Sequence, residues 1–200
     1  MGQSVQQRLK TLGGAGGTFT AGEAVRAGLS ARTLYRRCGT GEVTRVSRGV
    51  YQITGAANAI SPDYAAIAKR VPNGVICLLS ALYHHGLTTE IPREIHLAVS
   101  RNASIPRLDY PRVRVFRMSP APFQAGIEQL TIGGAELRIF SPEKTLADCF
   151  KYRNLLGVST AVEALRSYMS RQGSNPGRIL DMARVCRVEE IIRPYLEALA

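Results

Sequence analysis

One short segment of the chain brings together an acid, a base and a second acid. Glu143, Lys144 and Asp148 lie within about a turn and a half of an expected helix. Two carboxylates and an amine at this spacing could exchange protons with a substrate, as general acid–base catalysis requires. The same segment also suits a helix start, with Ser141 as the N-cap and Pro142 in the first turn. Lys144 would then pair with Asp148 four residues on. We expect the structural role, and an enzyme that acts on nucleotides or RNA through these three residues is the alternative.

Three histidines are the other candidates for chemistry. His84 and His85 are adjacent, so they would point in different directions on a helix, and His96 lies in an expected strand. Even with Glu90 or Glu94 nearby, the spacing matches no metal-ligand pattern. We expect His85 to pack or cap a helix, and we expect no metal site.

Motifs that would indicate an enzyme are missing from the sequence. The chain has no GxxxxGK[ST], GxSxG, HExxH or GxGxxG motif. The glycine cluster at 13–17 follows an expected helix, and no Lys-Ser/Thr pair comes after it, so it does not fit a phosphate-binding loop. We therefore expect neither a cofactor nor enzymatic activity.

The basic residues are unevenly distributed along the chain. The 200 residues include 26 Lys or Arg and 15 Asp or Glu, for a formal net charge of +11. Of the basic residues 22 are Arg, a bias that the codon usage of a GC-rich genome can largely explain. Residues 1–58 contain eight basic and two acidic residues, a net charge of +6. Because so much of the excess lies in the first 58 residues, this segment favours an anionic partner such as nucleic acid.

Features that would direct the protein into or across a membrane are not apparent. The sequence has no run of about 18 apolar residues and does not begin with a secretory signal pattern. The cysteines at 38, 77, 149 and 186 form no CxxC motif and are typical of buried free thiols. We expect a cytoplasmic protein with no membrane partner.

The first 58 residues predict three short helices followed by a hairpin. A capping box from Thr20 to Glu23 opens the second helix, and Gly28 ends it. Ser30 then caps a third helix that Gly39 closes. Helix, short Gly-containing turn and helix is the geometry of a helix-turn-helix. The alternating segments that follow, with Gly49 in the turn between them, predict a β-hairpin wing.

The exposed face of the third helix is the candidate DNA-reading surface. Ala31, Leu34 and Cys38 are expected to face inward, which leaves the polar residues of the helix outside. The alternative is a small basic domain that holds a protein. The residues expected to read base edges are Arg32, Thr33, Tyr35 and Arg36, and those expected to contact the DNA backbone are Ser30, Arg37, Arg45 and Arg48.

Residues 59–200 predict a second domain that mixes helices and strands, with the boundary near residue 58. Strands are expected at 94–99, 113–117, 127–132 and 135–140, and helices at 62–70, 75–83, 142–152, 159–170, 176–186 and 188–199. The expected fold class is α+β, with an N-terminal winged helix-turn-helix followed by a small sheet flanked by helices.

A second group of arginines lies inside this domain. Arg112 and Arg114 would share one strand face, and Arg117 follows them. DNA, an acidic protein or water could cover such a surface. The possible second basic patch consists of Arg101, Arg107, Arg112 and Arg114.

Three segments of the sequence resemble the AbiEi family of antitoxins. They are the wing at 45–51, the segment 77–89 and the segment 141–154, which reads Ser-Pro-Glu-Lys-Thr-Leu-Ala-Asp-Cys-Phe-Lys-Tyr-Arg-Asn. The resemblance extends over essentially the whole chain. It implies an N-terminal winged helix-turn-helix that represses its own operon by binding inverted repeats in promoter DNA.

The resemblance also implies that residues 59–200 form an antitoxin domain that counteracts an AbiEii-like nucleotidyltransferase toxin in an abortive-infection, phage-defence operon. Many members of the family resemble type IV antitoxins, which implies that the toxin is counteracted without a stable complex. The antitoxin motif that the resemblance suggests comprises Ser141, Glu143, Lys144, Asp148, Lys151 and Arg153. A module that clasps an acidic toxin face is the remaining alternative.

Overall fold

The computed structural model describes residues 5–13, 18–47, 49–54, 62–105, 108, 110–132 and 135–199. The chain divides into two units. The first consists of Met1–Gly74, Ile105–Arg112 and Gln129–Leu137, and the second of Val75–Ser104, Val113–Glu128 and Arg138–Ala200. The predicted boundary near residue 58 lies outside the described residues.

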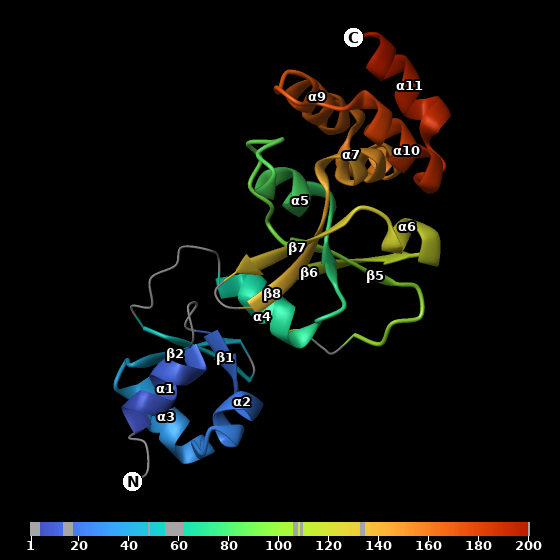
Figure 1. The fold of residues 1–200 in the computed structure, drawn as a ribbon. Helices are drawn as coiled ribbons and strands as arrows, with labels where there is room; N and C mark the ends of the chain where they lie inside the picture. Colours follow the sequence, from blue (N-terminus) through green and yellow to red (C-terminus); the bar gives the residue numbers. More distant parts are fainter. Residues whose placement is uncertain are drawn as a thin grey trace. The chain divides into compact units, whose positions relative to one another are not determined.

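Short helices and a small sheet make up the first unit (Figure 1). Strands β1 and β2 each pair antiparallel with β3, so the sheet order is β1-β3-β2. The elements are α1 (Val5–Gly13), β1 (Thr18–Thr20), α2 (Ala21–Arg26), α3 (Ala31–Gly39), β2 (Val43–Ser47), β3 (Val50–Ile53) and α4 (Pro62–Arg70). The predicted order of three helices and a hairpin is confirmed.

The helix-turn-helix of this unit depends on the caps that the sequence predicts. The Thr20 side chain accepts a hydrogen bond from the backbone of Glu23, and the Glu23 carboxylate accepts one from the backbone of Thr20, which completes the capping box. Gly28 ends the turn with a φ of 78°. Beneath these helices, Phe19 and Leu34 are buried in the apolar core of the unit. The two helices are therefore fixed both by local hydrogen bonds and by packing.

The second unit contains a five-stranded mixed sheet in the order β6-β5-β4-β8-β7. β4 pairs antiparallel with β5 and parallel with β8, and β5 pairs parallel with β6. The strands are β4 (Val75–Ile76), β5 (Ile95–Ser100), β6 (Val113–Met118), β7 (Ile127–Ile132) and β8 (Ala135–Phe140). The parts of β7 and β8 within 129–137 group with the first unit.

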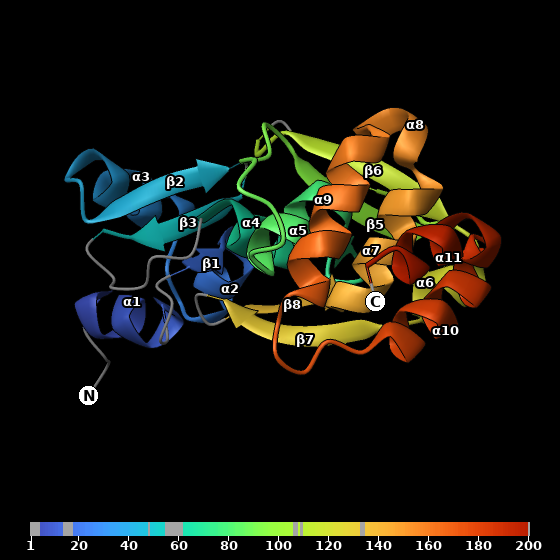
Figure 2. The ribbon, with the colours of Figure 1, turned by 90° about the horizontal axis from the view of Figure 1, so that it is seen from above.

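Helices of the second unit gather on one face of this sheet (Figure 2). They are α5 (Leu78–His84), α7 (Pro142–Lys151), α8 (Arg153–Leu156), α9 (Val158–Met169), α10 (Pro176–Cys186) and α11 (Glu189–Glu197), while α6 (Pro120–Gln124) follows β6. Helix α7 contacts α5, α9, α10 and α11. The mixed α+β class is confirmed, and α7 is the central helix of the layer.

One predicted element is wrong at its start. The apolar run 75–83 predicts a single helix, whereas Val75 and Ile76 form strand β4 and the helix begins at Leu78. A short apolar run fits a buried strand as well as a buried helix, and here pairing with both β5 and β8 decides the outcome. Leu78 takes a φ of 47°, which turns the chain sharply from strand to helix.

Candidate nucleic-acid interface

Helix α3 is amphipathic in the way that the sequence predicts for a recognition helix. Leu34 is 2% exposed and anchors the helix to the core. On the opposite side Arg32, Tyr35 and Arg36 are exposed, and Tyr35 keeps 63% of its surface in solvent. Among the described residues, none forms a hydrogen bond or an ion pair with Arg32 or Arg36. Ala31 was predicted to face inward, but it is exposed. It lies in the first turn of α3, before the part of the helix that Leu34 anchors to the core.

The start of α3 is capped by a short hydrogen-bonded cluster. The Oγ atom of Ser30 accepts a hydrogen bond from the backbone N–H of Thr33 at 3.2 Å. The Ser30 Oγ atom also lies 2.9 Å from the Thr33 hydroxyl oxygen. Both hydroxyls therefore stand at the positive end of the helix, where an anion such as a phosphate is favoured.

Arg37 differs from Arg32 and Arg36 because it forms an ion pair with an acidic side chain. Its Nη1 atom donates to both carboxylate oxygens of Glu42, at 2.5 and 2.6 Å. The hydrogen bond from Arg37 holds the pKa of Glu42 below its usual value. The positive charge of Arg37 is thus largely offset by its partner, so its predicted DNA contact has less support than those of Arg32 and Arg36.

Strands β2 and β3 form the predicted wing. Arg45 lies opposite Tyr51, and the register shifts between Arg45 and Ser47. Gly49 has a φ of 80°, the left-handed conformation that the turn requires. Tyr51 stacks on Phe19 at 5.9 Å, which ties the wing to the core. Arg45 is exposed, and Arg48 lies outside the described residues.

The second basic patch is only partly as expected. β6 begins at Val113, so strand alternation does not extend to Arg112, which is exposed. Arg114 lies 3.7 Å from Glu94 and 6.0 Å from the ring centre of Phe116. Arg101 is exposed, and Arg107 lies outside the described residues.

The segment that resembles an antitoxin motif starts helix α7 as predicted. Ser141 caps the helix by accepting from the backbone of Lys144, and Pro142 lies in the first turn. Lys144 and Asp148 form an ion pair with 2.5 Å between Nζ and Oδ2. Their side chains are only 0% and 1% exposed, which the sequence did not reveal. Burial raises the pKa of Asp148, although Lys144 and the Cys186 thiol act to lower it.

Two distant segments cover the pair. The Cys186 thiol of α10 donates to Oδ1 of Asp148 at 3.3 Å. The Lys144 ammonium group lies 4.1 Å from the ring centre of Phe140. Gly126 has a φ of 62°, and a Cβ there would come within 2.6 Å of the Lys144 Cβ. No larger residue fits at Gly126 without a shift of the backbone.

The other polar residues of this segment are also held within the protein. Glu143 accepts a hydrogen bond from the Tyr168 hydroxyl at 2.7 Å. Lys151 donates to the backbone oxygen of Cys186 at 3.1 Å, and Arg153 donates to that of Phe150 at 3.0 Å. The segment therefore joins α7 to α9 and α10.

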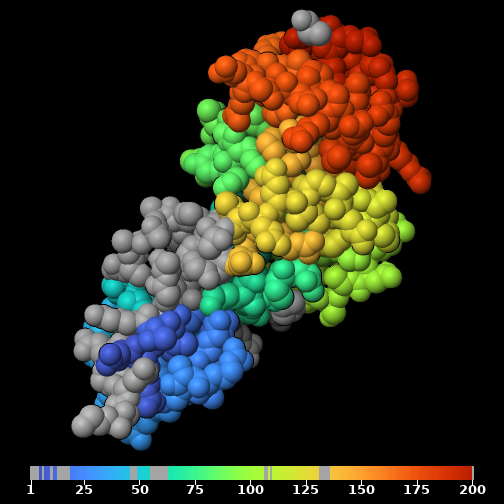
Figure 3. Space-filling model, viewed as in Figure 1, coloured from blue at the N-terminus to red at the C-terminus, as the bar shows by residue number. Residues whose placement is uncertain are grey.

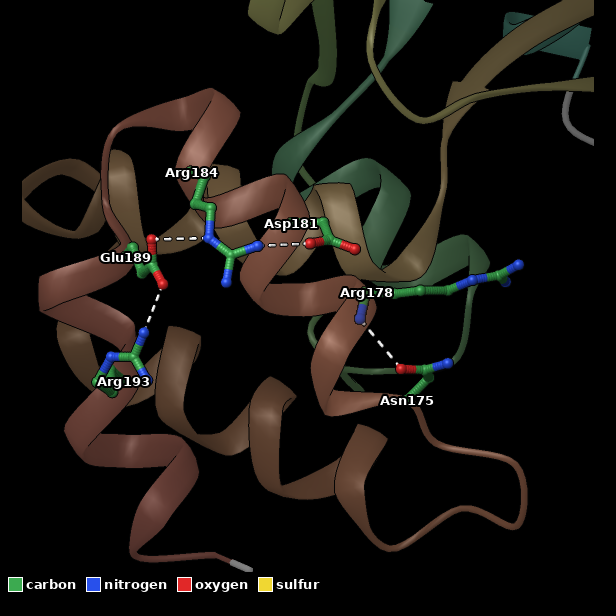
Figure 4. A network of polar contacts seen from close by, with 6 residues as sticks. All are labelled: Asn175, Arg178, Asp181, Arg184, Glu189 and Arg193. Atoms are coloured by element: carbon green, nitrogen blue, oxygen red, sulfur yellow. Dashed lines mark hydrogen bonds and ion pairs between the residues drawn. The ribbon is translucent and has the colours of Figure 1, made fainter.

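Charges on α10 and α11 neutralise one another (Figure 4). Arg184 contacts Asp181 at 2.7 Å and Glu189 at 3.1 Å, and Glu189 also contacts Arg193 at 2.5 Å. These helices belong to the continuous orange and red surface of the second unit (Figure 3). Because acidic and basic side chains pair along α10 and α11, these two helices lack the excess positive charge that nucleic acid requires.

The histidines take structural positions. The Nε2 atom of His85 lies 2.8 Å from the backbone oxygen of Phe140, and His85 caps α5. His96 is buried in β5 and packs 5.1 Å from the ring of Phe116. In the described ranges, no group of three His, Cys, Asp or Glu side chains could hold a metal ion. Within those ranges no helix is both long and apolar enough to cross a bilayer.

Comparison with known proteins supports the resemblance noted from the sequence. The family described as transcriptional regulator, AbiEi antitoxin, matches residues 7–54. The predicted resemblance to this family is confirmed over the segment from α1 to β3. None of the curated proteins matches the chain. One solved structure that matches is the crystal structure of the RV2827C protein from Mycobacterium tuberculosis, with 15% identity and a TM-score of 0.47. The match covers 90% of this chain and 75% of that one.

Proposed function

We propose that the AbiEi-type segment binds promoter DNA and represses the operon that encodes this protein. The observation that carries the proposal is the exposed face of α3, the second helix of the helix-turn-helix, where Arg32 and Arg36 form no hydrogen bond or ion pair with any described residue. An Arg fork can hydrogen-bond a guanine edge in the major groove. The inverted repeats that the family resemblance implies are the expected operator.

We assign two kinds of contact to this surface. The residues that read bases lie in the first two turns of α3, the part of a recognition helix that enters the groove. They are Arg32, Thr33, Tyr35 and Arg36. Ser30 and the wing residues Arg45 and Arg48 contact phosphates, with Arg37 the weakest candidate because Glu42 offsets its charge.

The test is a gel-shift titration on the intergenic DNA upstream of the gene, at two salt concentrations, with a scrambled duplex as competitor. The double variant Arg32→Ala/Arg36→Ala should lose about 1–3 kcal/mol of discrimination for each bidentate base contact that is removed. Arg166→Ala, on the exposed surface of α9, is the matched control and should bind like the wild type. Unchanged discrimination in the double variant would overturn the assignment.

We further propose that residues 59–200 carry the antitoxin activity and counteract a nucleotidyltransferase toxin encoded beside this gene. This part rests on the resemblance of the segment 141–154 to the family. Co-expression of this chain should restore the growth of cells that express the neighbouring toxin gene. The Arg32→Ala/Arg36→Ala variant should restore growth equally well. If that variant fails to protect, antitoxicity depends on DNA binding and the division of roles is wrong.

A stable complex is the second outcome to examine in the same cells. We expect the toxin not to co-purify with the chain. Co-purification at equal amounts would contradict this expectation and would favour a module that clasps an acidic toxin face.

A further inference from the structure

A small pocket opens in the second unit where β6, α6 and α7 meet. It has a volume of about 210 Å³. Arg101 after β5, Arg117 in β6, Ser119 at the start of α6, and Lys151 and Tyr152 at the end of α7 lie around it. This volume is below the range of about 300–1,000 Å³ of pockets for drug-sized ligands, so only a small molecule fits.

Two of the three cations at this pocket are fixed by backbone oxygens. Nη1 of Arg117 donates to the backbone oxygens of Arg101 and Ala103, at 2.9 Å each. Lys151 donates to the backbone oxygen of Cys186. These bonds hold the side chains in place without neutralising them, although Lys151 also acts electrostatically on the buried Asp148. In the part of the chain that the structure describes, no carboxylate forms an ion pair with Arg101, Arg117 or Lys151.

Among the described residues that line the pocket, the one acid is already bound by other side chains of the protein. Asp148 forms part of the floor, and only 1% of its side chain is exposed. Lys144 neutralises it from the protein side, and the Cys186 thiol donates to its other oxygen. The charge that a ligand meets is therefore positive, from three side chains on separate segments. The Tyr152 and Ser119 hydroxyls lie at the same pocket and can add hydrogen bonds to an anion.

We propose that this pocket binds the phosphate group of a small phosphorylated molecule. Arg guanidinium groups match the oxygens of a phosphate in geometry and charge, and Lys151 adds a point charge. Inorganic phosphate and a phosphomonoester such as a nucleoside monophosphate share this chemistry. The site is distinct from the α3 surface, and the proposal does not depend on operator binding.

Isothermal titration calorimetry on the full chain tests the proposal. The probes are inorganic phosphate, adenosine monophosphate and, as a ligand without phosphate, adenosine. The variants are Arg101→Gln and Lys151→Gln, and Arg166→Gln on α9 removes one positive charge away from the pocket. We expect saturable binding of at least one phosphate probe, a loss of about tenfold or more in both pocket variants, and no change in Arg166→Gln.

The two phosphate probes distinguish the sources of the ligand. Equal binding of phosphate and adenosine monophosphate assigns recognition to the phosphate alone, and tighter binding of the monophosphate assigns it to a phosphomonoester. Either supports the proposal. Absence of binding by both probes, binding of adenosine as tight as that of its monophosphate, or an equal loss in Arg166→Gln would overturn it. A thermal scan of each variant verifies folding, and since Arg101 is exposed its variant should unfold like the wild type.

Discussion

Helices α3 and α7 begin with the same device and lie in opposite surroundings. Ser30 and Ser141 each accept a hydrogen bond from the backbone three residues on, at 3.2 and 3.3 Å. Helix α3 then buries Leu34 and leaves Arg32 and Arg36 in solvent, whereas α7 buries every residue from 144 to 150. A charged side chain is thus exposed to solvent on one helix and part of the core on the other.

The difference lies in what surrounds each helix. Helices α5, α8, α9, α10 and α11 all contact α7, so its buried lysine is shielded from water and is neutralised by Asp148. Helix α3 has only one apolar side, so its exposed Arg32 and Arg36 stay in water and require no free energy of desolvation. A cap and a charge pattern predict where a helix forms. The elements packed around that helix determine whether its charged side chains are exposed or buried.

The largest expected effect comes from breaking the buried pair. Lys144→Met leaves Asp148 as a buried carboxylate without its partner, so the free energy of unfolding should fall by about 3–5 kcal/mol in urea titrations. The double variant Lys144→Met/Asp148→Leu removes both charges and should recover much of this loss. A single variant as stable as the wild type would show that α7 is not the charged core helix described above.

The two serine caps should differ in strength although their geometry is alike. Ser141→Ala leaves the backbone N–H of Lys144 buried without a partner and should cost about 2 kcal/mol of unfolding free energy. Ser30→Ala exposes the N–H of Thr33 to water, which replaces the lost bond, so we expect about 0.5–1 kcal/mol. Thermal unfolding of the two variants compares them directly, and equal losses would show that burial does not set the strength of a cap here.

Another ion pair, Lys69–Glu23 in the first unit, is intermediate in burial, with 14% and 36% of the two side chains exposed. Burial acts to raise the pKa of Glu23, but hydrogen bonds from Lys69 and Thr20 outweigh it and lower the pKa below 4.5. The resulting stabilisation is fully present above pH 4.5 and is lost as the pH falls through the lowered pKa.

The variant Glu23→Gln measures that contribution. At neutral pH it should unfold more easily than the wild type by up to about 1 kcal/mol, since the pair is partly exposed. The difference should shrink as the pH falls below 4.5. A difference that is constant with pH would mean that the carboxylate charge contributes nothing.

The smallest effect on stability is expected on the recognition face. Arg32→Ala and Arg36→Ala remove exposed side chains that form no hydrogen bond or ion pair with the described residues, so each should change the unfolding free energy by less than about 0.5 kcal/mol. Urea titration of the variants used for DNA binding supplies this measurement. A loss above 1–2 kcal/mol, well beyond that rough limit, would mean that these residues are part of the fold and would weaken the proposed role of α3.

Local signals made much of this fold predictable. The capping box at Thr20 and the cap at Ser30 involve residues three positions apart, and both are present as predicted. Strands β7 and β8 have the predicted bounds because apolar and polar residues alternate along them. The AbiEi resemblance is confirmed over the segment from α1 to β3.

Contacts between distant segments were not predictable in the same way. The buried Lys144–Asp148 pair is covered by Gly126, which lies against Lys144, and by Cys186, which donates to Asp148, and both residues are far from the pair in sequence. Strand β4 forms because β5 and β8 lie on either side of it. The proposed phosphate pocket combines three segments, and the sequence placed Arg101 and Lys151 in two separate candidate groups without indicating that they lie at one pocket. The predicted DNA contacts and the roles of the 141–154 segment stay predictions.

The free cysteines allow opening of the second unit to be followed chemically. Cys77, Cys149 and Cys186 are buried, and burial raises the pKa of each thiol, that of Cys186 to about 12. Alkylating reagents attack the thiolate, so modification of these three residues requires the core around α7 to open first. Cys38 in α3 is only half-buried and should react earlier. The rate at which these three buried cysteines are alkylated therefore reports, site by site and without an attached label, how often the second unit opens in its native state.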